Sequence, residues 1–116
     1  MKFVTKFVVD IDGTICELPG GVSDYAAAVP MQDRIRHMNA LYEAGHTIVY
    51  FTARGMGRTE GKTSKAYELF YELTKAQLSE WGAKHHELVL GKPAADVYVD
   101  DKAVNATSFF EVRSFE

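Results

Sequence analysis

The sequence predicts an α/β fold in which a central, mainly parallel sheet is covered by helices. Short stretches rich in β-branched and aromatic residues alternate with longer segments whose apolar residues recur at helical spacing. This alternation is typical of parallel sheets, whose strands are joined by helical crossovers. The chain has 116 residues, without a repeat or a linker-like tract, which suits one domain. We therefore expect residues 1–116 to form a single domain.

The first half of the chain predicts a strand, an irregular excursion and a helix. The β-branched and aromatic run at residues 7–9 is typical of a buried strand. Residues 13–29 contain a Pro-Gly-Gly sequence, which indicates an irregular or hairpin-like excursion. Pro30 suits the first turn of a helix with regularly spaced apolar residues, and Gly45 suits its end.

The second half predicts three more strands and one more helix. Residues 47–52 form a β-rich run, and a glycine-rich loop leads from it to a helix that ends near residue 82. Residues 87–90 predict a brief third strand, and residues 96–99 predict a fourth. Residues 93–95 would supply a short connection between these last two strands.

Composition and charge exclude several classes of protein. Hydrophobic residues make up 47% of the chain and charged residues 25%, as in ordinary globular domains. The net charge of −3 provides no basic field for nucleic acid or an anionic membrane. Cys16 is the single cysteine, so no intramolecular disulfide can form, and we expect it to be a small buried residue near the site. Without a signal-like or membrane-spanning run, a cytoplasmic location is expected.

Polar residues from separate segments follow the ends of the predicted strands. In open α/β sheets, ligands bind beyond the carboxyl ends of the strands. Three or four carboxylates gathered there need a cation, and oxygen ligands without histidine or thiolate favour Mg²⁺. The residues expected to meet at this edge are Asp10, Asp12, Thr52, Lys92, Asp100 and Asp101.

This set of residues suits phosphoryl transfer. A carboxylate can attack phosphorus as a covalent nucleophile, and Asp12, two residues after Asp10, could protonate the leaving oxygen and later deprotonate water. Lys92 would hold a phosphate oxygen, and the Thr52 hydroxyl would donate to the same group. Gly13 lets the chain turn sharply between these groups.

The motifs resemble those of the haloacid dehalogenase (HAD) superfamily of phosphatases, and they span the chain from residue 10 to residue 105. The first is Asp10-Ile11-Asp12-Gly13-Thr14, after an apolar strand. The later ones are Thr52 in Phe51-Thr52-Ala53-Arg54, Lys92 in Gly91-Lys92-Pro93, and Asp100-Asp101 after Val97-Tyr98-Val99. Four such motifs in order are far more specific than any one of them.

The resemblance implies a role for each acidic residue. Asp10 would be the nucleophile, forming an aspartyl-phosphate, and also a Mg²⁺ ligand. Asp12 would be the general acid and base and would bind the metal through its backbone carbonyl. Asp100 would bind Mg²⁺ directly, while Asp101 would either support the metal site or cap a helix.

The resemblance also implies residues that contact the substrate. Thr52 and Lys92 would bind the phosphoryl group that is transferred. Further substrate contacts are expected from neighbours of the motifs, namely Gly13, Ala53, Arg54 and Lys102. The glycines of residues 54–62 predict a loop that is mobile without ligand, from which Arg54 would select substrates that carry an additional polar or anionic group.

The gaps between the motifs are too short for the cap domain that many family members carry. The expected fold is therefore a Rossmann-like three-layer sandwich without a cap. The stretches at residues 52–55, 73–78 and 90–93 are similar to small capless phosphatases linked to capsule and surface-polysaccharide biosynthesis. This similarity implies a small phosphorylated metabolite, such as a sugar phosphate, as the substrate.

Two alternatives stay open. A capless site would also admit a macromolecular substrate, although the acidic net charge disfavours a polynucleotide. A non-catalytic, phosphate-binding scaffold domain is the other alternative, and the presence of both Asp10 and Asp12 argues against it. Capless members often assemble so that a neighbouring subunit shields the site, and this sequence leaves the homo-oligomeric state open.

Overall fold

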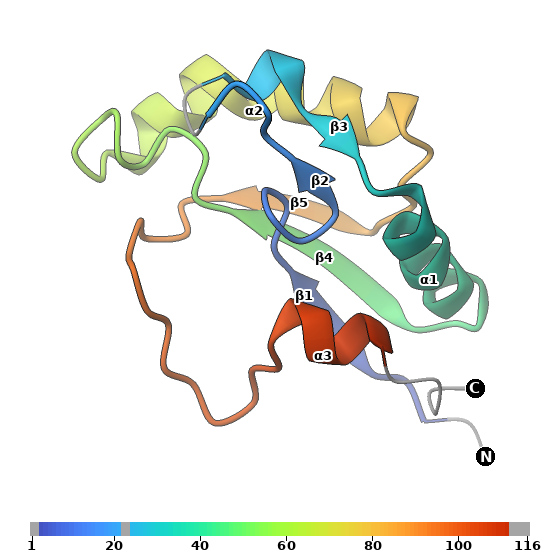
Figure 1. Ribbon diagram of the computed structural model, residues 1–116. Helices are drawn as coiled ribbons and strands as arrows, with labels where there is room; N and C mark the ends of the chain where they lie inside the picture. The colour runs from blue at the N-terminus through green and yellow to red at the C-terminus, as the bar shows by residue number, and fades with distance from the viewer. Residues whose placement is uncertain (1–2, 22–23, 112–116) are drawn as a thin grey trace.

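The computed structural model describes residues 3–21 and 24–111 (Figure 1). Strands and helices follow one another in the order predicted for residues 7–90, with a short additional helix near the C-terminus. The elements are β1 (Lys6–Val9), β2 (Cys16–Glu17), the 3-10 turn η1 (Tyr25–Ala27), β3 (Val29–Pro30), α1 (Gln32–Glu43), β4 (Thr47–Thr52), α2 (Thr63–Glu80), β5 (Glu87–Leu90) and α3 (Ala106–Glu111).

The central sheet has three parallel strands in the order β1-β4-β5. Val9 of β1 is paired with Tyr50 of β4, and Tyr50 is paired with Leu88 of β5. All three strands therefore end at one edge. The predicted α/β class with a central parallel sheet is confirmed.

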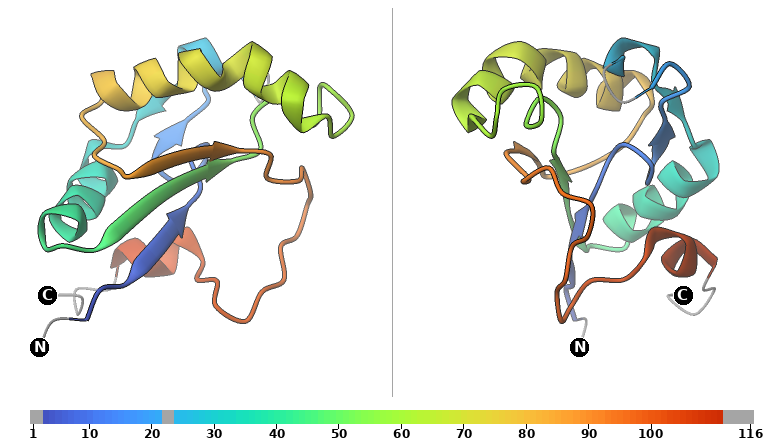
Figure 2. Two further views of the ribbon diagram at one scale, coloured as in Figure 1. Left: turned by 180° about the vertical axis from the view of Figure 1, so that it is seen from behind. Right: turned by 60° about the vertical axis from the view of Figure 1, so that its left-hand side comes forward.

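One face of the sheet carries the main hydrophobic core. Ile48 and Tyr50 of β4 are fully buried against Ile35 and Met38 of α1 and Leu78 of α2. Figure 2 shows α1 and α3 on the same side of the sheet. A second cluster forms under the first half of α2, where the buried residues are Met56, Ala66, Phe70 and Leu90.

The opposite face of the sheet is apolar but less covered. Val49 is buried at its centre, while Phe51 and Val89 are half-buried. Val8, on the edge strand β1, is 59% exposed.

None of the helices in the described part of the chain has the length and apolar character that a membrane span requires.

The predicted end of α1 is confirmed, but its beginning is not. Gly45 adopts a φ of +99°, which lets the His46 N–H reach the Leu41 carbonyl at 3.1 Å and close the helix. The helix begins at Gln32 because Pro30 is taken into β3, where it is paired with Cys16 of β2. The β2–β3 pair confirms the hairpin-like excursion.

The predicted fourth strand is wrong. Residues 96–99 form no strand, and every residue from 93 to 105 is exposed. This C-terminal arm (residues 93–105) leaves the carboxyl end of β5, swings away from the sheet and returns to α3 (Figures 1 and 2). The reason lies in connectivity. Parallel strands need a crossover of about a dozen residues, and the five residues 91–95 are too few.

A buried hydroxyl gives a prediction about stability. Tyr50 is fully buried, and its hydroxyl has no hydrogen-bond partner among the described residues. Burial also raises the pKa of this hydroxyl. Because an unpaired buried polar group costs free energy, Tyr50→Phe should leave the free energy of unfolding unchanged or raise it by about 1 kcal/mol. Urea titration followed by circular dichroism measures this, and a clear destabilisation would reveal a partner for the hydroxyl.

Candidate active site

A pocket of about 330 Å³ lies at the carboxyl edge of the sheet. Six predicted residues line it together, five of which have polar or charged side chains: Asp10, Asp12, Thr52, Arg54 and Lys92. Ala53, also predicted, is part of the wall. Leu18, Tyr25 and Tyr98 are further lining residues that the sequence did not single out.

The turn after β1 presents both aspartates to the pocket. Ile11 is completely buried in the core and anchors the chain between them. Its carbonyl accepts the N–H groups of Thr14 at 3.0 Å and Ile15 at 2.9 Å. Gly13 has a φ of +82°, which residues with a side chain rarely adopt, so it makes the turn without lining the pocket.

Asp10 lies beside a lysine that arrives from another strand. The Lys92 ammonium is 3.4 Å from Asp10 Oδ1, and the Thr14 hydroxyl donates to Oδ2 at 3.2 Å. The Lys92 N–H donates to the Thr52 carbonyl at 3.2 Å, which fixes the residue at the end of β4. The ammonium also lies 4.3 Å from the centre of the Tyr98 ring. The predicted meeting of Asp10 and Lys92 is therefore present.

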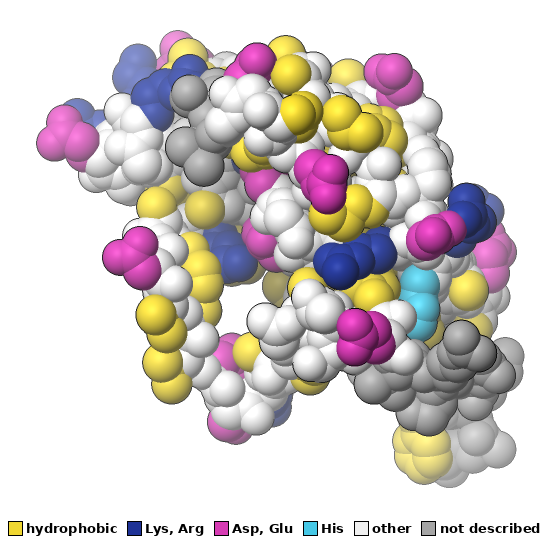
Figure 3. Space-filling view, viewed as in Figure 1, with side chains coloured by type: hydrophobic (Ala, Val, Ile, Leu, Met, Phe, Trp, Pro, Cys, Tyr) yellow, Lys and Arg dark blue, Asp and Glu magenta, His cyan; other side chains and the backbone are white. Residues whose placement is uncertain are grey.

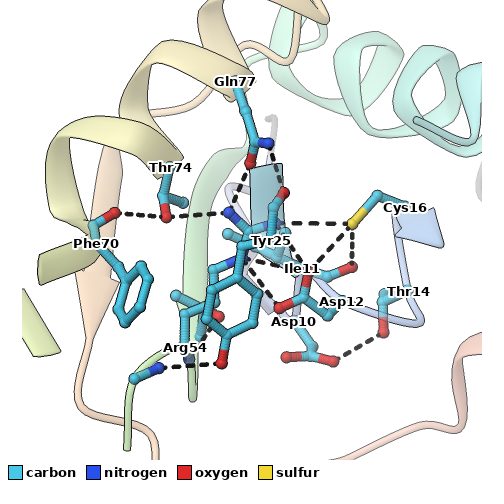
Figure 4. Close-up of polar contacts among 12 residues, drawn as sticks. Asp10, Ile11, Asp12, Thr14, Cys16, Tyr25, Arg54, Phe70, Thr74 and Gln77 are labelled. Atoms are coloured by element: carbon cyan, nitrogen blue, oxygen red, sulfur yellow. Dashed lines mark hydrogen bonds and ion pairs between the residues drawn. The ribbon is translucent and has the colours of Figure 1, made fainter. Parts of the chain in front are cut away.

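Asp12 is held by a buried arginine (Figure 4). Arg54 Nη2 donates to Asp12 Oδ1 at 2.8 Å, and Nε donates to Oδ2 at 3.0 Å. The Arg54 side chain is completely buried. Its Nη1 donates to Thr74 Oγ1 at 3.1 Å and to Gln77 Oε1 at 2.6 Å, and its guanidinium lies 5.0 Å from the centre of the Tyr25 ring. A two-pronged contact of this kind fixes both the position and the plane of the carboxylate.

The Arg54 side chain is therefore buried and is not displayed on an open loop. Its guanidinium points into the protein, and the Gly55 N–H donates to the Tyr25 hydroxyl at 3.2 Å, which ties the start of the loop to η1. A side chain added at Gly55 would come within 2.7 Å of the Phe70 ring. The first part of this loop is thus packed against Tyr25 and Phe70.

Sequence reasoning missed the residues that hold Arg54. Thr74 and Gln77 are buried on the inner face of α2, and Gln77 Nε2 also donates to the Tyr25 carbonyl at 2.7 Å. The available signal was a threonine and a glutamine at core-facing helical positions, since such positions normally carry apolar residues. A buried polar side chain needs a partner, and here the partner is a guanidinium.

Thr52 and Cys16 complete the inner wall. Thr52 is 1% exposed, and its hydroxyl oxygen accepts the Arg54 backbone N–H at 3.1 Å. Cys16 is fully buried, and its thiol donates to Asp12 Oδ1 at 3.3 Å. Burial, together with the nearby Asp12 carboxylate, raises the pKa of this thiol to about 12. The expected small buried residue is confirmed.

Cys16 should therefore react slowly with thiol reagents in the folded protein. The thiolate is the reactive form, and it is scarce at pH 8 when the pKa is about 12. We expect little release of thionitrobenzoate from Ellman's reagent at pH 8 until urea unfolds the chain, when one equivalent reacts promptly. Rapid labelling without urea would contradict this burial.

The remaining predicted residues lie outside the pocket. Asp100, Asp101 and Lys102 are on the exposed C-terminal arm, and none of them lines the pocket. Asp100 Oδ1 accepts the Lys102 N–H at 2.8 Å, and this bond lowers the pKa of Asp100. Among the described residues, no three acidic, histidine or cysteine side chains are grouped so that they could hold a metal. The four acidic residues are therefore not brought together in one chain.

Solved protein structures similar to this one include the following two. An MCSG target from Vibrio cholerae matches with a TM-score of 0.85 and 29% identity, over 96% of this chain and 91% of that one. A D,D-heptose 1,7-bisphosphate phosphatase from B. bronchiseptica, complexed with magnesium and phosphate, matches with a TM-score of 0.53 and 16% identity. That match covers 86% of this chain and 54% of the phosphatase. No family model and no curated protein matches the sequence.

These similarities show the fold of the protein. The Vibrio cholerae protein shares nearly the whole chain length, and the phosphatase shares its fold, of which this chain spans about half the length. This chain shares its fold with a phosphatase, as the resemblance of the four motifs implied.

Proposed function

We propose that the protein is a phosphomonoester hydrolase in which Asp10 is the nucleophile. The observation that carries this proposal is the pair of Asp10 and Lys92, whose charged groups lie 3.4 Å apart at the pocket. A carboxylate cannot approach an anionic phosphate unless a cation offsets the repulsion, and Lys92 is placed to do this. The Thr52 hydroxyl adds a neutral donor on the same wall.

The reaction would have two steps. An Asp10 oxygen forms a bond to phosphorus while the bond from phosphorus to the ester oxygen breaks, and Asp12 gives its proton to that leaving oxygen. A water molecule then attacks the phosphorus of the aspartyl-phosphate, Asp12 takes a proton from the water, and the Asp10 carboxylate is released. Arg54 orients the Asp12 carboxylate for both transfers.

A Mg²⁺ requirement is part of the proposal, but one chain presents an incomplete set of ligands. The Asp10 carboxylate and the Asp12 backbone carbonyl are suitable oxygen donors in the first turn. The Asp12 carboxylate is already paired with Arg54, and Asp100 and Asp101 lie away from the pocket. The residues of a single chain therefore do not fit the full site, and the mechanism above routes no step through the ion.

The substrate class we propose is a small phosphorylated metabolite, such as a sugar phosphate of surface-polysaccharide biosynthesis in the cytoplasm. A pocket of about 330 Å³ is at the lower end of the range for small-molecule sites. Tyr25 on its wall offers apolar ring surface for a substrate. The structural neighbour that acts on a heptose bisphosphate supports the same class.

A phosphate-release screen tests this proposal. The purified protein is incubated with a panel of sugar phosphates, nucleotides, phosphopeptides and p-nitrophenyl phosphate, with Mg²⁺ or with excess chelator. We expect sugar phosphates to be the best substrates and chelator to remove the activity until Mg²⁺ is restored. Undiminished activity in chelator would exclude the metal, and a preference for phosphopeptides would favour the macromolecular alternative.

A further inference from the structure

The C-terminal arm (residues 93–105) is built like a strand but is not used as one. Val97 is 73% exposed, Val99 94% and Val104 63%. Among the described contacts, the hydrogen bonds of the arm join two of its own residues, such as Tyr98 and Pro93, or join the arm to the start of α3. Figure 3 shows the arm standing away from the body, with a hollow between the two. Exposed apolar residues in strand-like alternation indicate a segment that needs a partner.

The sheet offers a matching edge. Within the described residues, β1 pairs with β4 on one side and with no strand on the other. The apolar Val8 is exposed on this edge strand. A parallel strand added here would end next to Asp10, which directly follows β1. Residues 96–99, with Asp100 and Asp101 after them, have the right length and order for that position.

The arm cannot reach this edge on its own chain. From the end of β5, the chain would have to cross three strand spacings, about 14 Å, and return about 13 Å to the start of the sheet. The straight line from the end of β5 to the start of the added strand is thus about 19 Å long. This line runs through the sheet, so the chain would have to take a longer path around it. Six Cα steps from Leu90 to Asp96 span at most about 22 Å when fully extended. An antiparallel strand would be within reach, but it would leave Asp100 and Asp101 at the wrong edge.

We propose that two copies of the chain exchange their arms. Residues 96–99 of one copy pair in parallel with β1 of the other and bring Asp100 and Asp101 to Asp10 of that second copy. The exchange is reciprocal, so it closes as a two-fold dimer with two equal sites. The inference rests on the proposed function, because it supplies the carboxylates that the pocket of one chain lacks. A short connection that cannot fold back on its own chain is a known cause of such exchange.

The first test needs no activity. We expect the wild-type protein to behave in light scattering as a dimer, with twice the 13.0 kDa mass of one chain. Val97→Asp combined with Val99→Asp should give a monomer with the circular dichroism spectrum of the wild type. Leu69→Asp is the matched control, because Leu69 is equally apolar and 52% exposed on α2, and it should stay dimeric. A monomeric wild type, or a double variant that remains dimeric, overturns the exchange.

The second test asks which chain supplies Asp100. Heterodimers are made by co-expressing two chains with different tags and purifying over both. Asp10→Asn paired with Asp100→Ala should have about half the wild-type turnover per dimer, since exchange rebuilds one intact site. Wild type paired with the Asp10→Asn/Asp100→Ala double variant should be inactive, because each site then contains one lesion. Without exchange, the Asp10→Asn and Asp100→Ala pair should be inactive. The pair of wild type and double variant should then have about half the wild-type turnover.

The outcomes separate the two proposals. A wild-type protein that is dimeric and loses its dimer with the arm substitutions, but releases no phosphate from any substrate, contradicts the proposed function and leaves the exchange standing. A wild-type enzyme that is active, but whose heterodimers follow the pattern without exchange, overturns the exchange alone. Failure to recover any heterodimer means that the chains do not associate, and it overturns the exchange as well.

Discussion

Asp10→Asn is expected to reduce phosphate release by about 10³-fold or more, the largest effect of any single substitution in this protein. The amide has nearly the same shape as the carboxylate, but its oxygen is a much weaker nucleophile toward phosphorus. Steady-state assays on the best substrate of the screen measure the loss. Because Asp10 is half-buried and Thr14 can still donate to an amide oxygen, the fold should be kept.

Asp33→Asn serves as the control for this variant. Asp33 lies on the exposed surface of α1, where it pairs with Arg36. The activity and thermal unfolding of the Asp33→Asn variant should therefore match those of the wild type. A second measurement supports the covalent step. Beryllofluoride, which mimics an acyl phosphate, should raise the melting temperature of the wild type but not of Asp10→Asn. An Asp10→Asn enzyme with more than a few per cent of the wild-type turnover would exclude this nucleophile.

Arg54→Lys is expected to have the second largest effect. Lysine keeps the positive charge but cannot make the two-pronged contact with Asp12 or reach Thr74 and Gln77 together. General acid catalysis contributes about 10²-fold or more, and a misplaced acid loses much of it. We therefore expect kcat on an alkyl phosphate to fall by about 100-fold.

The leaving group distinguishes a positioning role from a structural one. The nitrophenolate ion leaves without a proton, whereas a sugar alkoxide needs one. Arg54→Lys should therefore lose much less activity on p-nitrophenyl phosphate than on a sugar phosphate. Arg58→Lys, in the same loop, is the control and should stay close to wild type on both substrates, because Arg58 is exposed and stacks on the Phe70 ring. Equal losses on both substrates would mean that Arg54 only supports the fold.

The sheet and half of the site could be predicted from the sequence because their signals are local. The strand at β4 is a continuous β-rich run, and the aspartates directly follow β1. Parallel strands then bring their carboxyl ends together without further information, so Asp10, Thr52 and Lys92 meet at one pocket.

The errors involve relations between distant parts of the chain. Residues 96–99 look like a strand locally, but parallel pairing depends on the length of the connection before them. Arg54 follows a predicted motif and precedes a glycine, so it resembles a residue of an open loop. Its burial depends on Thr74 and Gln77, which are 20 and 23 residues further along the chain. No pattern near residue 54 carries that information.

The buried guanidinium also limits how this sequence can evolve. Losing Arg54 alone would leave the polar groups of Thr74 and Gln77 buried without a partner, and losing either of them would leave a donor of Arg54 unpaired. We therefore expect single substitutions at these positions to be selected against, whereas the fold should tolerate their joint replacement by apolar residues. Across homologues, residues 54, 74 and 77 should be kept or replaced as a group, and lineages that have replaced them should also have changed how they orient the residue at position 12.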